Sequence, residues 1–453
     1  MSLPAESPWQ RQGWFSFDGF REGVVSLIFL SSFFVKVEPA ATDYFAILAI
    51  VLFLGSGLHF SRYLAPGMLF LILFLVSSII ATIPISKPII HADDSPYGYA
   101  IGLMVTASSA VFLAGYISAD PMRRFRQIER AYWIGATIGA ILGLLIYFRI
   151  EPFYTSIQTI GDNRLGDFQF RVRGAYKDPN VYATWLLFPV VSMVQAFMVG
   201  RLRIGLVSLG SFLTILLALL LAFSRGAWID AVAATSLAVI LTALNSPSGR
   251  QRGRIVTLAV VGIGFIAVVI AALLSIPGMQ AAFLDRFVLV KSYDSGEIGR
   301  FGNQLNAIPM LLRLPFGFGP YQFQEYFGLA PHNTFLNAFS AGGWMGGIAY
   351  LMLTVTNFAY GFKAIFTRSP YQSYAIVVFC SFVVMTFQGV QIDDEHWRHL
   401  YWLMGIGWGL VTAACQSAEN GYWPDAFRAG WSLGGDARDQ GINEPALSQA
   451  PTA

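Results

Sequence analysis

Residues 255–276, IVTLAVVGIGFIAVVIAALLSI, form an uncharged and mostly apolar run. A helix of about 20 residues crosses a hydrocarbon core about 30 Å thick, so this run is long enough to cross a membrane. The rest of the chain agrees with it, because 55% of its 453 residues are apolar and 12% are charged. Ordinary soluble domains carry about 25% charged residues. The sequence therefore predicts an integral membrane protein.

Similar runs recur along the chain, separated by Pro, Gly or charged residues. We predict an all-α polytopic bundle of about twelve transmembrane helices. They lie near residues 23–40, 43–60, 64–83, 98–118, 131–148, 181–199, 205–223, 226–244, 255–276, 340–362, 372–391 and 398–415. This divides the chain into a cytoplasmic N-terminal segment (1–22), a transmembrane domain (23–415) and a flexible cytoplasmic tail (416–453).

Two connections in the transmembrane domain are long, residues 149–180 and 277–331. Basic residues elsewhere cluster in short loops such as DPMRRFRQIER (120–130) and NSPSGRQRGR (245–254). The positive-inside rule places these short loops and both termini in the cytoplasm. The two long loops then face the periplasm, and long loops within a compact bundle often carry function.

The first long loop ends FRVRGAYKDPNVYATW (170–185), where Asp178 and Pro179 predict the start of a helix. The positive end of that helix favours anions, and Arg171, Arg173 and Lys177 lie beside it. We interpret this cluster as part of an anion site. The alternative is that these side chains pair with phospholipid phosphates at the membrane surface.

A second candidate is LAFSRGAW (221–228), where one apolar run ends and the next begins at once. The turn is too short for Arg225 to move far from the membrane, and Ser224 can cap the following helix. A planar guanidinium group suits the oxygens of a phosphate. The alternative is that Arg225 extends to water, as arginines at helix ends often do.

The second long loop places Arg300 ahead of an amphipathic stretch, LNAIPMLLRLP (305–315), which we expect at the periplasmic membrane interface. The loop closes at APHNT (330–334). A helix that begins near Asn333 would place His332 beside its positive end, which disfavours the imidazolium form. We therefore expect a neutral His332 that can accept a proton. The alternative is a histidine that only caps the helix.

Asp393, Asp394, Glu395 and His396 precede the last predicted span. We interpret this acidic stretch as a solvated loop with Arg398 as counter-ion, or as a support for the site. The alternatives are that it binds a cation, supplies a second base or orients His332. No His, Cys and carboxylate residues have a convincing metal-ligand spacing, so we expect neither a metal nor a cofactor.

Four motifs occur in order along the chain. They are Arg173-Gly174 with Pro179-Asn180, Ser224-Arg225-Gly226, Arg300 ahead of Pro315-Phe316-Gly317-Phe318-Gly319, and His332-Asn333. Each is weak alone. Together, over residues 170–345, they resemble the O-antigen ligase and O-antigen polymerase superfamily of bacterial envelope glycosyltransferases.

The resemblance implies a C-type glycosyltransferase fold in the bacterial inner membrane. It implies a glycan donor linked to undecaprenyl diphosphate, and transfer on the periplasmic side without a metal. By the same resemblance, Arg225 and Arg300 hold the diphosphate and His332 activates the acceptor hydroxyl. We add Arg173 to the diphosphate site, with Asn333, Ser224 and Asn180 in support. The expected partners are this donor, lipid A core or a growing polysaccharide as acceptor, and membrane lipids, but no nucleic acid.

Ligase and polymerase share this donor chemistry, and Pro331-His332-Asn333 matches the ligase motif slightly better. A lipid-linked glycan flippase or transporter is the alternative from another class. Such a protein predicts charges buried at mid-membrane and pseudo-repeated halves. The sequence has no clear repeat, and its notable charges lie at span ends, so we favour the transferase.

Overall fold

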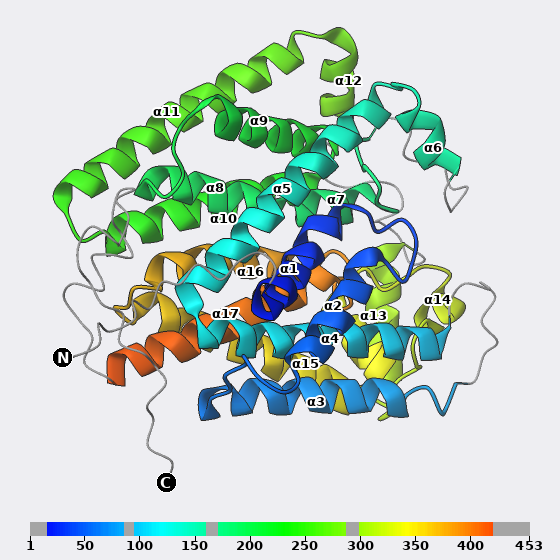
Figure 1. The fold of residues 1–453 in the computed structure, drawn as a ribbon. Helices are drawn as coiled ribbons and strands as arrows, with labels where there is room; N and C mark the ends of the chain where they lie inside the picture. Colours follow the sequence, from blue (N-terminus) through cyan, green and yellow to red (C-terminus); the bar gives the residue numbers. More distant parts are fainter. Residues whose placement is uncertain (1–15, 86–94, 160–170, 287–298, 420–453) are drawn as a thin grey trace, which may run out of the picture.

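The computed structural model describes residues 16–85, 95–159, 171–286 and 299–419, and the regular elements among them are helices (Figure 1). The α-helices of the first half are α1 (Phe17–Leu30), α2 (Ala41–Phe53), α3 (Ala65–Ile80), α4 (Pro96–Ala119), α5 (Pro121–Tyr147), α6 (Phe153–Thr159), α7 (Pro179–Trp185), α8 (Leu187–Val199) and α9 (Leu206–Leu221). Those of the second half are α10 (Arg225–Asn245), α11 (Gly249–Leu274), α12 (Pro277–Arg286), α13 (Arg300–Leu311), α14 (Gln322–Phe327), α15 (Thr334–Phe366), α16 (Gln372–Gln388) and α17 (Arg398–Glu419). Short 3-10 helices cover Ser31–Phe33 and Arg62–Leu64.

The predicted fold class is confirmed as all-α, since the described residues contain no sheet and only an isolated bridge between Phe34 and Ala175. Each of the twelve predicted apolar segments contains a helix. Within the described ranges, seven helices are long and apolar enough to cross a membrane. They are Arg62–Ile80, Pro96–Ala119, Pro121–Tyr147, Pro179–Val199, Arg225–Asn245, Gly249–Leu274 and Thr334–Phe366. The helices α2, α9 and α16 are apolar but shorter, so twelve crossings remain a prediction.

Helix boundaries differ from the predicted spans where a cap extends the helix. The fifth predicted span begins near residue 131, whereas α5 begins at Pro121 because Asp120 accepts a hydrogen bond from the Arg123 N–H at 3.4 Å. Similarly, Asn333 accepts from the Leu336 N–H at 2.9 Å, and α15 begins beside it. The capping residues move these helix starts into the polar loops.

The centre of the bundle is formed by α16 and α17, which are buried along most of their length. Glycines on α17 allow α4 to approach closely. A Cβ on Gly405 would lie 2.3 Å from the Ala110 carbonyl oxygen, and one on Gly409 would lie 2.6 Å from the Ile117 Cβ. Small residues at such contacts let helix backbones pack tightly, which is how membrane helices associate.

The long helix α15 is broken at Gly343, whose φ of 65° lies in the left-handed region. Residues 315–319, the Pro-Phe-Gly-Phe-Gly motif, pack into this break. The Trp344 N–H donates to the Pro315 carbonyl at 2.9 Å, and a Cβ on Gly317 would lie 2.4 Å from the Ser340 carbonyl oxygen. The motif therefore needs its glycines because it lies directly against the backbone of α15.

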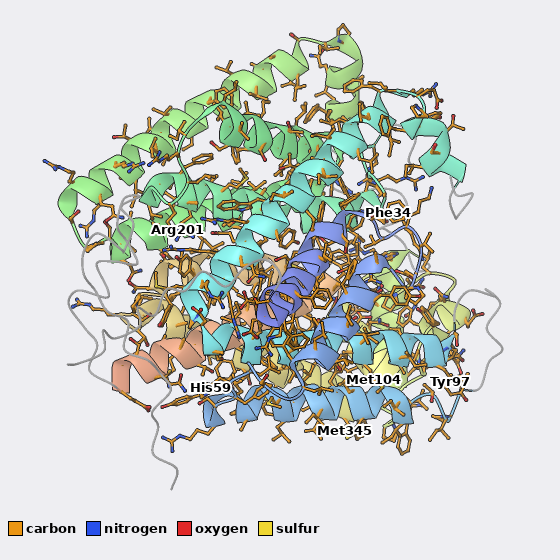
Figure 2. All side chains as sticks on the ribbon, viewed as in Figure 1. Phe34, His59, Tyr97, Met104, Arg201 and Met345 are labelled. Carbon is orange, nitrogen blue, oxygen red and sulfur yellow. The ribbon has the colours of Figure 1, made fainter. Side chains whose placement is uncertain are left out.

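The helices run between two ends of the bundle (Figure 2). Arg201 and His59 lie at one end, and Phe34 and Tyr97 lie at the other. We call these the Arg201 end and the His332 end. His332 lies at the same end as Tyr97. The nearby Tyr99 hydroxyl donates to Glu395 at 3.1 Å, and Asp393, in the same loop as Glu395, contacts His332.

Candidate functional site

Four helices begin at the residues that the sequence motifs identify. Their N-cap residues are Asp178 (α7), Ser224 (α10), Gly299 (α13) and Asn333 (α15). Three of the caps are side chains that accept a hydrogen bond from the first turn. Helix starts carry partial positive charge and free N–H groups, so each of these positions favours an anion.

The first loop lies against the turn that precedes Arg225. The Val172 N–H donates to the Leu221 carbonyl at 2.9 Å, and Arg171 Nε donates to the Ala222 carbonyl at 2.8 Å. Arg171 Nη2 also donates to the side-chain oxygen of Asn180 at 2.7 Å. These contacts bring the start of α7 beside the end of α9.

Arg173 and Lys177 differ in their surroundings. Arg173 Nη1 donates to the Lys177 carbonyl at 3.1 Å, and Lys177 Nζ pairs with Glu38 at 2.9 Å. Lys177 therefore has a carboxylate counter-ion from the loop after α1. Asn180, which we predicted as a supporting residue, contacts Arg171 and not Arg173.

A junction at the end of α16 connects α7 with the starts of α10 and α15. Gln388 accepts a hydrogen bond from the Thr184 hydroxyl of α7 at 2.9 Å, and a Cβ on Gly226 of α10 would lie 3.4 Å from Gln388 Nε2. The next residue, Gly389, accepts from the Thr334 N–H of α15 at 2.6 Å. The end of α7 and the starts of α10 and α15 thus meet at Gln388 and Gly389.

The His332 backbone is held in an unusual conformation. Its φ of 48° is uncommon for a residue with a side chain, and such strain persists only where neighbours enforce it. Asp393 accepts from the N–H groups of His332 at 3.0 Å and Asn333 at 2.9 Å. Arg300 Nη2 donates to the carbonyls of His332, at 3.4 Å, and Gln391. The structure therefore brings Arg300, His332 and Asp393 together.

Further hydrogen bonds hold the same segment from both sides. Gln304 Nε2 of α13 donates to the Pro331 carbonyl at 2.8 Å, and Asn333 Nδ2 donates to the Val390 carbonyl at 3.2 Å. The Thr334 hydroxyl donates to the Ile392 carbonyl at 2.8 Å. Residues 331–334 are thus fixed between α13 and the loop 389–397.

The interpretation of the acidic stretch as a solvated loop is wrong, because the side chains of Asp394 and Glu395 are 1% and 0% exposed. Glu395 accepts from the Asn337 amide of α15 at 2.6 Å and contacts His396 Nδ1 at 3.2 Å. Arg398 is not its counter-ion, since it binds Asp43 at 2.6 Å. The stretch instead packs against the first turns of α15.

The surroundings of this loop change the acidity of its side chains. Burial raises the pKa of Asp393 and Asp394. Burial acts in the same direction on Glu395, but His396 overcomes it and holds the pKa of that carboxyl below its usual value. Burial opposes protonation of His396, yet the contact with Glu395 raises the pKa of that imidazole. Glu395 and His396 therefore form an ion pair beside α15.

The turn before Arg225 is also strained. Phe223 has a φ of 48°, and its ring lies 5.2 Å from that of Phe283 and 6.1 Å from that of Trp228. Phe283 comes from α12, so this cluster attaches the second long loop to the start of α10. Ser224 is 3% exposed and caps α10. The packing places Arg225 at the first position of the helix.

Sequence reasoning missed Gln388 and Gln304, since no local pattern marks a lone glutamine as a junction. Asp393 was noticed, but only the structure assigns it to the backbone of His332 and Asn333. In the part of the chain that the structure describes, no three His, Cys or acidic residues are placed to hold a metal ion.

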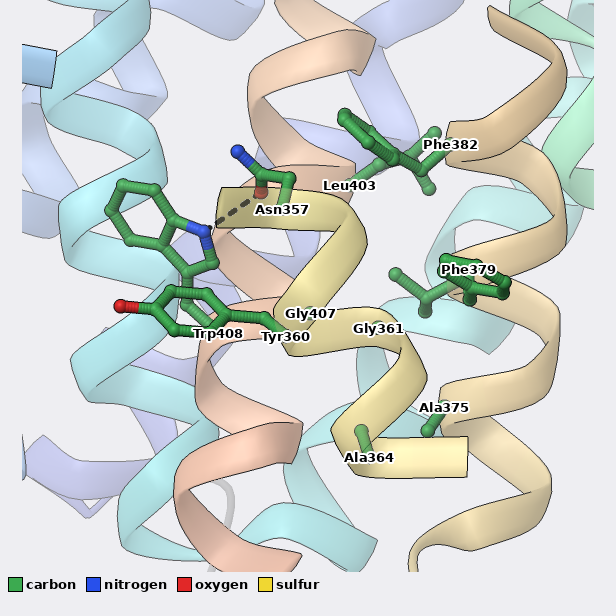
Figure 3. A pocket seen from close by; sticks show the side chains of 11 residues that line it. Asn357, Tyr360, Gly361, Ala364, Ala375, Phe379, Phe382, Leu403, Gly407 and Trp408 are labelled. Carbon is green, nitrogen blue, oxygen red and sulfur yellow. Dashed lines mark hydrogen bonds between the residues drawn. The ribbon is translucent and has the colours of Figure 1, made fainter. Parts of the chain in front are cut away.

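An apolar pocket between α15, α16 and α17 lies in the half of α15 remote from His332 (Figure 3). Two polar side chains that line it are hydrogen-bonded to each other: Trp408 Nε1 donates to the Asn357 side chain at 2.8 Å. Tyr360, which also lines it, donates to the Tyr63 carbonyl at 2.6 Å. We assign this pocket to helix packing and not to the functional site.

Residues 210–351 match the family model described as O-Antigen ligase (Wzy_C). The matched stretch runs from α9 into α15 and contains Ser224, Arg225, Arg300, His332 and Asn333. Arg173, Asn180 and Asp393 lie outside it. None of the curated proteins compared with the chain matches it.

Proposed function

We propose that this chain, a membrane protein of the O-antigen ligase family, transfers a glycan from undecaprenyl diphosphate to a lipid or saccharide acceptor on the periplasmic side of the bacterial inner membrane. The observation that carries the proposal is the junction at Gln388 and Gly389. It gathers the start of α10, with Arg225, and the start of α15, with His332, which Arg300 contacts.

In the proposed reaction, an acceptor hydroxyl attacks the anomeric carbon of the donor sugar. The new bond joins the acceptor oxygen to that carbon, and the bond from the carbon to the phosphate oxygen breaks. Undecaprenyl diphosphate leaves with the bonding electron pair, and the hydroxyl proton passes to His332. Negative charge therefore grows on the leaving phosphate while a proton is lost from the acceptor.

Arg225 and Arg300 stabilise the charge on the leaving diphosphate. A guanidinium group can donate two parallel hydrogen bonds to phosphate oxygens. One such donor typically contributes a few kcal/mol in the transition state. The positive starts of α10 and α13 add to the same field. In this proposal the cationic side chains supply the stabilisation that a divalent metal gives elsewhere, so transfer needs no metal. Arg173 contributes from the first loop.

His332 accepts the proton. The bonds from Asp393 and Arg300 act on its backbone, so the imidazole is positioned by a rigid main chain. Asn333 caps the helix behind it, and Ser224 does the same for Arg225. A base held in this way typically contributes about 10²–10⁴ in rate.

A ligase and a polymerase differ in the acceptor, which is lipid A core for one and the next lipid-linked repeat for the other. We favour the ligase slightly, since Pro331-His332-Asn333 matches the ligase motif better. A polymerase of O-antigen or exopolysaccharide is the alternative, and a lipid-linked glycan flippase is the alternative from another class.

The test uses the purified protein in detergent with a labelled oligosaccharide on undecaprenyl diphosphate and both candidate acceptors. We expect free undecaprenyl diphosphate to appear together with a glycosylated lipid core, identified by mass. Longer repeats on the lipid carrier would favour the polymerase. A protein that releases no undecaprenyl diphosphate here, but moves the intact donor across sealed vesicles, would be a flippase.

A further inference from the structure

Asp230 is a buried carboxyl group that the proposed reaction leaves without a role. It lies on α10, five positions after Arg225, and it is 6% exposed. Its Oδ2 atom is buried and has no hydrogen-bond partner among the described residues. A buried polar group without a partner is costly, and ionisable residues inside membrane helices are usually functional for that reason.

The described helices around Asp230 provide no cation to pair with it. The helix α10 packs mainly against α7, α8, α9, α11 and α16. Of these, only α11 contains Lys, Arg or His, and its arginines lie in its first two turns, at the Arg201 end. Arg225 lies on another side of α10, since five positions rotate a helix by about 140°. An ionised carboxylate in such surroundings is far more costly than the neutral acid, whose O–H can donate a hydrogen bond.

The position of Asp230 on α10 directs it towards α16. Gly226, one turn earlier, meets this helix near Gln388, because a Cβ on Gly226 would lie 3.4 Å from Gln388 Nε2. At the other end of α10, Asn245 accepts from Gln372 Nε2 at 3.0 Å. With about 100° of rotation per residue, Asp230 lies about 40° from Gly226 and Asn245 lies about 100° from it, in the same sense. Asp230 is thus on the face between the two residues that contact α16.

Gln388 is the nearest polar side chain on that face of α16. Side chains on a helix lean towards its N-terminus, so the Asp230 carboxyl lies over the turn that contains Gly226. Gln388 is itself 6% exposed, and its Oε1 accepts from the Thr184 hydroxyl at 2.9 Å. In the described part of the chain, Gln388 Nε2 donates to no acceptor. An amide N–H and a carboxyl oxygen, both without a partner, therefore occupy neighbouring positions of one helix contact.

We propose that Asp230 is a positioning residue, which binds Gln388 as a neutral acid and thereby fixes the start of α10. The inference deepens the proposed function and rests on it, because α10 begins with Arg225, which stabilises the leaving diphosphate. Gln388 then has a partner on α7 and another on α10, and the next residue, Gly389, accepts from α15. This chain of contacts holds Arg225 in register with the segment that carries His332.

The first experiment compares kcat for Asp230→Leu and Asp230→Asn, measured per folded molecule with the undecaprenyl donor. Leucine has a similar volume but makes no hydrogen bond, so we expect kcat to fall about tenfold, equivalent to about 1.4 kcal/mol, while the donor KM changes less. Asparagine cannot ionise, but its side-chain oxygen can accept from Gln388 Nε2, so it should recover most of the rate.

Two further variants test the route of the effect. Asp230→Leu combined with Gln388→Leu should be no slower than Gln388→Leu alone, because Asp230 acts through Gln388. Independent effects would instead multiply. Thr412→Val is the matched control. It removes a buried hydroxyl from α17, which is outside the helices that pack mainly against α10, and should not change the rate.

A second readout does not depend on transfer. The infrared spectrum of the wild type minus that of Asp230→Asn isolates the C=O stretching band of the protonated Asp230 carboxyl. A hydrogen bond lowers the frequency of this band. The same difference measured in the Gln388→Leu background should therefore lie at higher frequency, whereas Thr412→Val should leave the band in place.

The inference is overturned if Asp230→Asn removes no carboxylic-acid band, if Gln388→Leu does not move that band, or if Asp230→Leu transfers as fast as Asp230→Asn. A lower unfolding temperature of Asp230→Leu with normal kcat would also overturn it, since that result describes a purely structural residue. The two readouts separate this inference from the proposed function. If the wild type releases no undecaprenyl diphosphate, the proposed function fails, and a shifted band still supports the bond between Asp230 and Gln388. Normal transfer without a band shift rejects the inference and leaves the proposed function standing.

Discussion

The two ends of the bundle differ in whether residues other than glycine adopt positive φ angles. At the Arg201 end, the described residues with positive φ are Gly57 and Gly200. At the His332 end, glycines such as Gly174 and Gly319 also have positive φ, and so do Arg149, Phe223, Tyr321 and His332, which carry side chains. Glycine adopts this conformation without strain, whereas other residues need their neighbours to enforce it. Backbone strain is therefore concentrated at the end where we place the chemistry.

Arg201 and Arg300, which lie at opposite ends, also make different contacts. At the Arg201 end, Arg201 pairs with Glu129 at 2.9 Å, lies 4.5 Å from the Tyr374 ring and binds the Gln195 amide. At the His332 end, Arg300 and Asp393 bind backbone carbonyl and N–H groups. The first arrangement stabilises a helix junction, and the second controls the conformation of a loop.

The comparison is tested most severely by His332→Ala. If the strained segment exists to position a base, we expect transfer to fall about 10²–10⁴-fold while the protein still inserts and binds the donor. Release of undecaprenyl diphosphate is the measurement. His59→Ala, at the Arg201 end, is the matched control and should retain the wild-type rate. Full activity of the His332 variant would reject the base assignment.

Arg225→Ala and Arg300→Ala test the anion site. Each removes one donor to the leaving diphosphate, so we expect kcat to fall about 10²–10³-fold. Lysine at either position should recover part of the rate, because it keeps the charge but loses the paired geometry. Arg313→Ala is the control, since Arg313 is exposed in the same loop. A rate unchanged in both variants would place the diphosphate elsewhere.

Arg201→Ala tests the opposite end. Removing one partner of a buried ion pair typically costs about 3–5 kcal/mol, so we expect a clearly lower unfolding temperature in detergent. Transfer per folded molecule should stay near the wild-type value. Arg203→Ala is the control, because Arg203 is exposed in the same loop. A large loss of kcat with normal stability would show that the two ends are not functionally distinct.

Asp393→Asn tests the hydrogen bonds that the Asp393 carboxylate accepts from the N–H groups of His332 and Asn333. One amide oxygen cannot accept both N–H groups as the carboxylate does, so we expect kcat to fall about tenfold with little change in donor KM. Because burial raises the pKa of Asp393, protonation should weaken the same contact in the wild type as the pH falls. An ordinary Asp has a pKa of about 4. The acid-side loss of activity should therefore begin at a pH above that value. Equal losses in KM and stability would indicate a purely structural role.

His396→Gln gives the smallest expected effect. Glu395 raises the pKa of His396, so the ion pair stabilises the fold below the unfolded imidazole pKa of about 6.5 and is lost as the pH rises through the folded value. His396 is half-exposed, which limits the contribution to at most about 1 kcal/mol. The difference in unfolding temperature between variant and wild type should be larger at acidic than at alkaline pH. The opposite trend would exclude the ion pair.

Local chemistry made much of the fold predictable. Apolar runs anticipated a helix in each of the twelve segments, and Asp178, Ser224 and Asn333 were anticipated near helix starts because capping depends on neighbouring residues. The breaks between α7 and α8 and at Gly343 were not anticipated. They arise from contacts with distant segments, such as residues 315–319 against α15.

By itself the sequence determined the all-α membrane class and the identity of the basic motifs, since both depend on composition and short spacing. Only the tertiary structure decided which residues meet. Gln388 joins α7 to α10, and its partner Thr184 lies 204 positions away in the chain. Asp393 binds His332, which lies 61 positions away. The folded backbone sets such distances, because hydrogen bonds between remote segments leave no periodic or local signal in the chain.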